Sequence, residues 1–242
     1  MAKKDKIFEE GNVSCLPFSF NQEVTEVFED MIDRSVPGYI TTLNIIKQQS
    51  KKHSRENTNI YDLGCSLGAS TASIINGVEG RAKIIGIDSS ESMIMSCNTK
   101  FSNLIEEGVV EFLNENICNS VIQNASIVVI NFVLQFLELS ERQKLMKKIY
   151  EGLNPDGILL LSEKVHFESE RETAEISKIH HSFKSKNGYS ELEISGKRDS
   201  LEGVLITETE KQHIKRLEEV GFINPIKLMF DLNFLTYKFE KQ

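Results

Sequence analysis

Residues 59–70 constrain this chain more than any other stretch, because they combine a short apolar strand with a glycine turn. The strand ends near Asp62, and the turn contains Gly64 and Gly68 before a helical segment begins at Ala69. Glycine has no Cβ and adopts left-handed backbone conformations readily, so a ligand can lie against such a turn at the N–H groups of a helix start. The spacing therefore indicates a nucleotide-like binding site.

The same turn is not a dinucleotide fingerprint, which requires the pattern G-x-G-x-x-G. Here residues 64–68 read G-x-S-x-G, and the motif counted from Asp62 reads D-x-G-x-x-x-G. This looser pattern is typical of sites that hold one adenosyl group without a pyrophosphate. Many strand-to-helix turns carry two glycines, so an ordinary turn without a ligand is the alternative.

The composition indicates a folded protein and excludes several classes. The chain has 242 residues, 40% of them hydrophobic, which is enough for a full-sized core. Because the sequence has no run long enough to span a bilayer and no secretion signal, we expect a cytoplasmic protein without membrane contact. The net charge of −8 argues against a large nucleic-acid footprint. The scattered cysteines predict reduced thiols and no metal site: Cys15, Cys65, Cys97 and Cys118.

Hydrophobic periodicity predicts an α/β domain preceded by a short arm. We expect a flexible N-terminal arm over residues 1–20 and a single ligand-binding domain over residues 21–242. Strands alternate with helices from Ile60 onward, and the apolar run at residues 125–131 is typical of a parallel strand buried on both faces. We interpret the charged run at residues 51–56 as a solvated linker.

After Glu163 the alternation stops. Two polar helical segments follow, and we expect residues 165–206 to form a helical insertion over the ligand site. Two final strands are predicted between Phe222 and Phe239. A capping box at residues 140–143 predicts the start of the helix that precedes the fifth strand.

Polar residues at two predicted strand ends are candidates for ligand contacts. Asp88 ends a buried strand twenty residues after Gly68, the separation at which a carboxylate reaches ribose hydroxyls in a βαβ nucleotide unit. Capping of the next helix together with Ser89 and Ser90 is the alternative. Asn131 ends the apolar strand at the edge where open α/β sheets bind ligands, and a turn cap is its alternative.

Tyr39 lies at a chain reversal upstream of the glycine turn. An aromatic residue there is placed to cover a ligand, and burial in the core is the equal alternative. His180 and His181 in the insertion are candidates for a proton transfer, although packing or surface positions are the commoner fate of such histidines.

The order of five alternating βα units and a terminal strand pair looks like the class I S-adenosylmethionine-dependent methyltransferase fold. This fold is a Rossmann-like α/β architecture. It has a mainly parallel seven-stranded sheet with helices on both faces, and here we expect the helical insertion after the fifth strand.

Six blocks of sequence carry a narrower resemblance. They are Arg34-Ser-Val-Pro-Gly-Tyr39, Tyr61-Asp-Leu-Gly-Cys-Ser66, Asn131-Phe-Val-Leu-Gln-Phe136, Lys148-Ile-Tyr-Glu-Gly-Leu-Asn-Pro155, Leu161-Ser-Glu-Lys164, and Asn187-Gly-Tyr-Ser-Glu-Leu-Glu-Ile194 with Lys197-Arg198. These blocks closely resemble the carboxy-S-adenosyl-L-methionine synthase family and cover nearly the whole chain. Asn116 departs from the family, which usually has an acid there; an amide can still accept from an adenine amino group.

The resemblance implies a homodimer that binds S-adenosylmethionine and prephenate and makes carboxy-S-adenosylmethionine and phenylpyruvate. A downstream tRNA carboxymethyltransferase would then use the product to modify wobble uridine. A small-molecule methyltransferase and a non-catalytic adenosyl-binding module are the alternatives. The implied ligand contacts are Tyr39, Gly64, Cys65, Ser66, Asp88, Ser89, Asn116, Ile117, Asn131 and Arg198.

Arg198 enters only through the resemblance, which makes it the candidate catalytic residue. A planar guanidinium binds a carboxylate through two parallel hydrogen bonds, which suits the carboxylate that distinguishes the product from S-adenosylmethionine. Without the family, Arg198 and Lys197 would be a solvated helix face. We expect Lys197 and Lys184 to add positive potential at the site.

Overall fold

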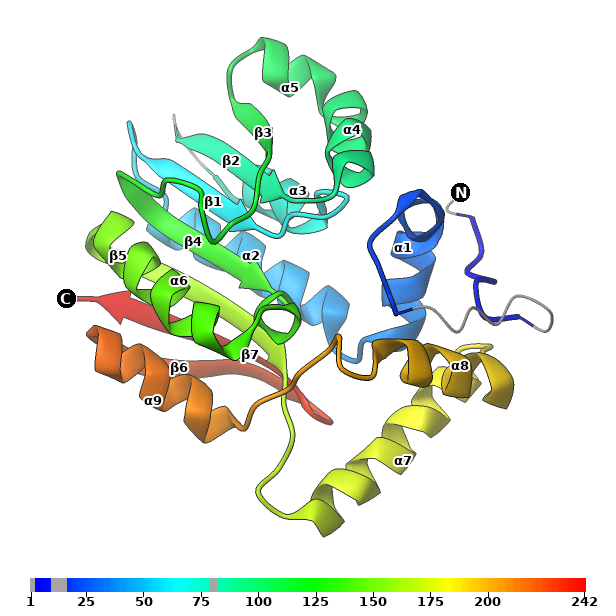
Figure 1. The fold of residues 1–242 in the computed structure, drawn as a ribbon. Helices are drawn as coiled ribbons and strands as arrows, with labels where there is room; N and C mark the ends of the chain where they lie inside the picture. Colours follow the sequence, from blue (N-terminus) through cyan, green and yellow to red (C-terminus); the bar gives the residue numbers. More distant parts are fainter. Residues whose placement is uncertain (1–2, 10–16, 79–81) are drawn as a thin grey trace.

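A seven-stranded sheet forms the centre of the molecule, in the order β3-β2-β1-β4-β5-β7-β6 (Figure 1). The computed structural model describes residues 3–9, 17–78 and 82–242. The first five strands are parallel, and β7 runs antiparallel to both β5 and β6. The strands are β1 (Asn59–Leu63), β2 (Lys83–Asp88), β3 (Val110–Asn114), β4 (Ala125–Asn131), β5 (Leu153–Lys164), β6 (Phe222–Asp231) and β7 (Phe234–Lys241). The predicted fold class is confirmed.

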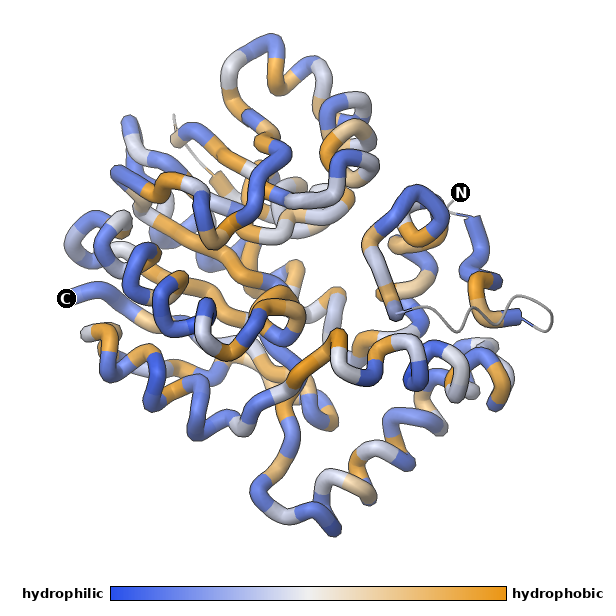
Figure 2. Tube along the Cα trace, in the orientation of Figure 1, coloured by the Kyte–Doolittle hydropathy of each residue, from blue (hydrophilic) through white to orange (hydrophobic). Residues whose placement is uncertain are grey.

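Helices cover both faces of this sheet, because side chains of successive strand residues point to opposite faces. Tyr61 and Leu63 of β1 belong to one core cluster, while Ile60 belongs to the other. The first core is closed by α6 (Leu139–Gly152) and α9 (Glu210–Val220). The second is closed by α2 (Tyr39–His53), α3 (Ala69–Ile75) and α4 (Glu91–Lys100), with α5 (Ser102–Glu106) following α4. Figure 2 shows the apolar residues concentrated along the central strands.

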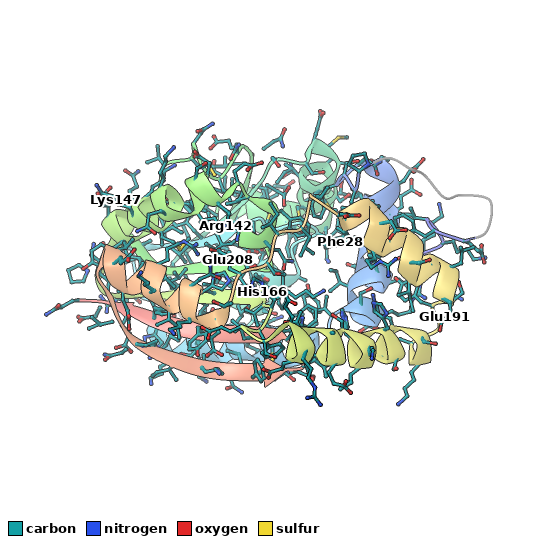
Figure 3. All side chains as sticks on the ribbon, turned by 60° about the horizontal axis from the view of Figure 1, so that its bottom comes forward. Phe28, Arg142, Lys147, His166, Glu191 and Glu208 are labelled. Carbon is teal, nitrogen blue, oxygen red and sulfur yellow. The ribbon has the colours of Figure 1, made fainter. Side chains whose placement is uncertain are left out.

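Two local predictions differ from the structure. Helix α2 continues to His53, so the first half of the predicted linker is helical. Helix α6 begins at Leu139 without a side-chain cap, so the capping-box prediction is wrong. Arg142 of that predicted box instead points into the protein, where it binds Glu208 and the Leu137 carbonyl (Figure 3).

The first part of β5 contains a bulge. Leu153 pairs with Ala125 and Ile158 pairs with Ile127, so extra residues loop out between these two pairs. Asp156 in this loop has a φ of 56°.

The insertion after β5 consists of α7 (Glu170–Lys186) and α8 (Glu191–Leu201), which lie beside α1 (Gln22–Ser35) in Figure 1. His180 of α7 binds the carbonyl of Ser35 at 2.8 Å, and the Phe18 N–H donates to the Ser200 carbonyl at 2.8 Å. The insertion therefore closes against the N-terminal part of the chain. Its predicted position over a ligand site stays a prediction.

The predicted arm has anchored residues. Asp5 and Phe8 are buried, and the Asp5 N–H donates to Asp30 at 2.7 Å. The arm's residues 1–2 and 10–16, which include Cys15, lie outside the described residues, so flexibility of the arm stays a prediction.

Candidate functional site

The glycine turn joins β1 to α3 at the carboxyl edge of the sheet. The N–H groups of Gly64 and Cys65 donate to the Ile87 carbonyl at 2.8 and 3.1 Å, which ties the turn to β2. Gly64 and Gly68 have φ values of 76° and 75°, in the left-handed region that favours glycine.

The space that these glycines leave open is filled by the protein itself. A Cβ on Gly64 would lie 2.5 Å from Val133, and one on Gly68 would lie 2.6 Å from Phe101. Our expectation that the missing Cβ atoms make room for a ligand therefore needs correction. The glycines are required by backbone conformation and by packing.

Asp88 connects the glycine turn to the start of α4. One carboxylate oxygen accepts the Ser66 N–H at 2.9 Å, and the other accepts the Ser90 N–H at 2.9 Å. The cap of α4 is Ser90 rather than Asp88, because the Ser90 hydroxyl accepts from the Met93 N–H. Burial raises the pKa of Asp88, opposed by these N–H groups. The exposed Ser89 lies beside this carboxylate in the chain.

Two buried oxygens at this edge lack a partner within the described part of the chain. Asn131 donates from its amide to the Ser70 hydroxyl at 3.0 Å, and its carbonyl Oδ1 is unpaired. Asp62 accepts from the Thr71 hydroxyl at 2.6 Å through Oδ2, and its Oδ1 is unpaired. Because buried polar atoms normally have a hydrogen-bond partner, both oxygens are candidate acceptors for a ligand.

Asp62 is a residue whose individual role sequence analysis missed, although it opens the D-x-G-x-x-x-G motif. Burial, helped by the nearby charge of Asp88, raises the pKa of Asp62 to about 7. The D-x-G-x-x-x-G motif, which begins at Asp62, was the sequence signal that could have identified this residue. In the fold, Asp62 and Asn131 lie on the paired strands β1 and β4.

Tyr39 begins α2 and packs with Phe132, at 6.4 Å between ring centroids. Burial raises the pKa of the Tyr39 phenol, and the charge of Asp62 raises it further. The ring packs against an apolar cluster, which agrees with the core interpretation, and its role as a cover over a ligand stays a prediction.

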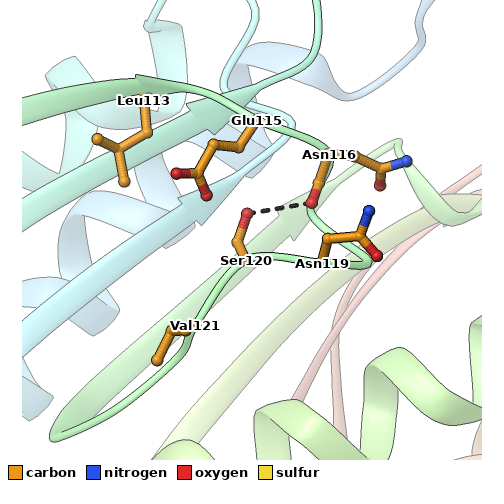
Figure 4. Close-up of a pocket in the computed structure, with 6 residues that line it drawn as sticks. All are labelled: Leu113, Glu115, Asn116, Asn119, Ser120 and Val121. Carbon is orange, nitrogen blue, oxygen red and sulfur yellow. Dashed lines mark hydrogen bonds between the residues drawn. The ribbon is translucent and has the colours of Figure 1, made fainter.

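Asn116 lines a surface pocket of about 430 Å³ next to the end of β3 (Figure 4). Its Oδ1 accepts the Cys118 N–H at 2.9 Å, and its backbone carbonyl accepts the Ser120 hydroxyl at 3.1 Å. Ile117 is buried in the core under α6. The Cys65 side chain is buried in the opposite core, where contact with Cys97 and burial raise its pKa, so it does not face solvent.

Arg198 stands apart from the other predicted contacts. Its guanidinium binds Asp199, the next residue, at 3.0 Å, and its side chain is 63% exposed. Among the described residues the structure joins it by no bond to the glycine turn, Asp88 or Asn131. Its role is therefore not supported by contacts within one subunit.

His180 is a packed residue rather than a free base. Its Nε2 lies 2.8 Å from the Ser35 carbonyl, which can only accept, so this nitrogen carries the proton. Burial and the charge of Lys164 lower the pKa of His180 to about 3. Burial also lowers the pKa of His181, and the charge of Lys184 contributes.

In the described ranges no group of three His, Cys, Asp or Glu side chains has a metal-binding arrangement. Likewise, none of the helices described combines the length and apolar character needed to cross a membrane.

This chain is similar in sequence and in fold to known proteins. A family model described as a methyltransferase domain matches residues 60–157. A carboxy-S-adenosyl-L-methionine synthase from Shewanella halifaxensis is 46% identical over 219 residues, which cover 90% of each chain. One from Escherichia coli is 44% identical over 92% of this chain and 90% of its own. Magnesium protoporphyrin IX methyltransferase from Synechocystis, solved with bound SAH, has a TM-score of 0.61 at 14% identity, covering 88% of this chain and 87% of its own.

Proposed function

This chain belongs to the carboxy-S-adenosyl-L-methionine synthase family, and from that premise we propose that it converts S-adenosylmethionine and prephenate to carboxy-S-adenosylmethionine and phenylpyruvate. The observation that carries the proposal is the extent of the similarity. An identity of 46% covers 90% of both chains, far beyond the methyltransferase domain at residues 60–157. A shared fold alone would not specify the reaction, because one fold hosts many activities.

In this proposal the carboxyl edge of the sheet binds S-adenosylmethionine. Asp88 accepts from the ribose hydroxyls, since each of its oxygens has a lone pair beyond the bonds to Ser66 and Ser90. Asn116 and Ile117 contact the adenine. The unpaired oxygens of Asp62 and Asn131 receive the donors of the methionine part, and Tyr39 covers it.

The proposed reaction balances without a dedicated base from the protein. The methyl group next to the sulfonium loses a proton and forms a new C–C bond to carbon dioxide. Prephenate loses that carbon dioxide and its ring hydroxide as the ring becomes aromatic, and hydroxide and proton combine as water. The protein holds the two substrates close and excludes solvent, which is positioning and electrostatic stabilisation.

Arg198 would bind the carboxylate that the product gains. We further propose a cytoplasmic homodimer without a metal cofactor and without direct nucleic-acid binding, whose product passes to a tRNA carboxymethyltransferase. These points rest on the family resemblance and on the chain's charge of −8.

Incubation with S-adenosylmethionine and prephenate, followed by mass spectrometry, tests the function. We expect an S-adenosylmethionine product with one added carboxylate, together with phenylpyruvate. S-adenosylhomocysteine formed with a methylated acceptor would instead identify a methyltransferase. Bound but unchanged S-adenosylmethionine would identify a non-catalytic binding module.

The Arg198→Ala variant tests the role of the guanidinium. We expect it to weaken binding of carboxy-S-adenosylmethionine by about tenfold or more, the size of a charge-assisted bond, and that of S-adenosylmethionine much less. Calorimetric titration of both ligands measures the difference. Arg171→Ala, a change of another exposed arginine in the insertion, is the matched control. Equal losses for the two ligands would exclude the proposed role.

A further inference from the structure

Three lysines of the insertion and its flank lie in one partly buried region. Lys164 ends β5, Lys184 lies on α7 and Lys197 lies on α8, and all three have intermediate exposure. We call these three residues the lysine cluster. Most surface lysines extend into solvent, so the partial burial of all three lysines is unusual.

Contacts to Ser35 and Phe234 bring the three elements together. Ser35 accepts His180 of α7 through its carbonyl at 2.8 Å and Lys197 of α8 through its hydroxyl at 3.3 Å. The Phe234 ring lies 5.2 Å from the His180 ring and 5.8 Å from the Lys164 ammonium. Lys184 is four residues after His180, so both lie on the same face of α7.

No carboxylate in residues 3–9, 17–78 and 82–242 forms an ion pair with the lysine cluster. Asp5 attracts Lys197, but its oxygens already accept from the Tyr189 hydroxyl at 2.5 Å and the Ile7 N–H at 3.2 Å. Arg34 and Arg198 add further positive charge nearby.

The titration behaviour of the lysine cluster agrees with this missing counter-charge. Burial and repulsion by neighbouring cations lower the pKa values of Lys184 and Lys197 to about 8 each. Burial alone lowers the pKa of Lys164. Partly buried ammonium groups without counter-ions are costly, so the region is arranged for an anion.

A row of aromatic rings links the lysine cluster to the proposed adenosyl site. The Phe234 ring lies 5.7 Å from the Phe132 ring, which lies 6.4 Å from the Tyr39 ring. Phe132 directly follows Asn131, the residue with the unpaired amide oxygen. An anion held by the lysines would therefore lie next to the edge where the methyl donor is proposed to bind.

We propose that Lys164, Lys184 and Lys197 form an anion subsite that binds the carboxylates of the second substrate, a small dicarboxylic acid. This inference rests on the proposed function, in which prephenate is that acid. The partial burial fits a small anion, and the net charge of −8 disfavours a nucleic-acid backbone.

The Lys184→Gln variant tests the subsite, because the Lys184 side chain forms no hydrogen bond or ion pair with another described residue that would be lost. We expect the KM for prephenate to rise about tenfold, since a bond to a charged group is lost, while the Kd for S-adenosylmethionine stays within about twofold. Lys184→Arg should retain most of the affinity. Lys178→Gln, an exposed lysine on the same helix, is the control for general charge loss and should match the wild type.

Calorimetric titration of prephenate into the wild type and into Lys164→Gln and Lys184→Gln separates the two proposals. Weaker binding in both variants supports the subsite even if the wild type forms no carboxylated product, an outcome that would overturn the proposed function alone. Unchanged prephenate binding in both variants overturns the subsite. An equal loss of S-adenosylmethionine affinity would also overturn it, because the lysines would then belong to the adenosyl site.

Discussion

One cluster of charge lies beside the insertion and another lies largely within it, and their charges are balanced in opposite ways. The first, which we call the closed cluster, consists of Arg142, Glu208 and Arg216. Arg142 is fully buried and donates to Glu208 at 2.6 Å and to the Ile206 carbonyl at 2.8 Å, while Arg216 binds the other carboxylate oxygen of Glu208. In the lysine cluster the cations face one another without such a partner.

The difference distinguishes the closed cluster, whose charges stabilise the fold, from the lysine cluster, whose charges are proposed to bind a ligand. Burial opposes ionisation of Glu208, yet its hydrogen bonds from Arg216 and Arg142 lower its pKa overall. In the lysine cluster the shifts go against the charged form. Breaking the closed cluster should therefore lower the stability of the protein, whereas changing the lysine cluster should weaken binding of the proposed anion.

The largest expected effect follows from the Glu208→Ala substitution. Removing the carboxylate leaves Arg142 buried without its counter-charge, which costs about 3–5 kcal/mol of unfolding free energy. Urea unfolding measures this loss. Glu141→Ala, which breaks only the exposed pair with Lys144, should cost at most about 1 kcal/mol. A loss for Glu208→Ala as small as that of the control would remove the distinction between the clusters.

A second effect concerns the lysine cluster at alkaline pH. The folded pKa values of Lys184 and Lys197, about 8, lie below the usual 10.5, so the unfolded chain binds more protons between these values. Stability should therefore rise with pH from about 8 to 10.5. We expect the wild type to gain about 2–3 kcal/mol more than Lys184→Gln/Lys197→Gln, as measured by urea unfolding at pH 8 and pH 10. Parallel pH dependences in the two proteins would contradict the missing counter-charge.

A smaller effect belongs to His213, which lies beside the closed cluster with both ring nitrogens buried and unpaired in the described structure. Burial lowers its pKa to about 4, with Arg216, Arg142 and His166 contributing and Glu208 opposing. Below pH 6.5 the unfolded chain protonates His213 and the folded protein does not, so the free energy of unfolding decreases as the pH is lowered. His213→Leu should reduce the loss between pH 6.5 and 5 by about 1–2 kcal/mol in thermal or urea unfolding. If His213→Leu lost as much stability between pH 6.5 and 5 as the wild type, His213 would not be the group responsible.

Local patterns predicted the sheet well, because alternation and apolar runs depend on neighbouring residues. The strand ends at Asp88 and Asn131 were found for the same reason, since a carboxyl edge can be located from the strand itself. The packing reason for Gly64 was not accessible, because Val133 is distant in sequence and meets the turn only in the fold.

The failures arise where distant residues decide a local conformation. Arg142 matched a capping box but is drawn inward by Glu208, which lies 66 residues later. Lys184 and Lys197 were noted as sources of positive potential, yet Lys164 received no role. The lysine cluster becomes visible only when Ser35, Phe234 and the insertion are brought together.

The rings of Tyr39, Phe132 and Phe234 give the proposed reaction a property that charged groups cannot supply. Carbon dioxide carries no charge and offers little for a hydrogen bond, so neither Arg198 nor the lysines can retain it. The three rings, with centroids 6.4 and 5.7 Å apart, form an apolar row between the two proposed binding regions. In the proposed reaction, carbon dioxide released between the two binding regions would therefore have apolar side chains rather than charged groups as neighbours.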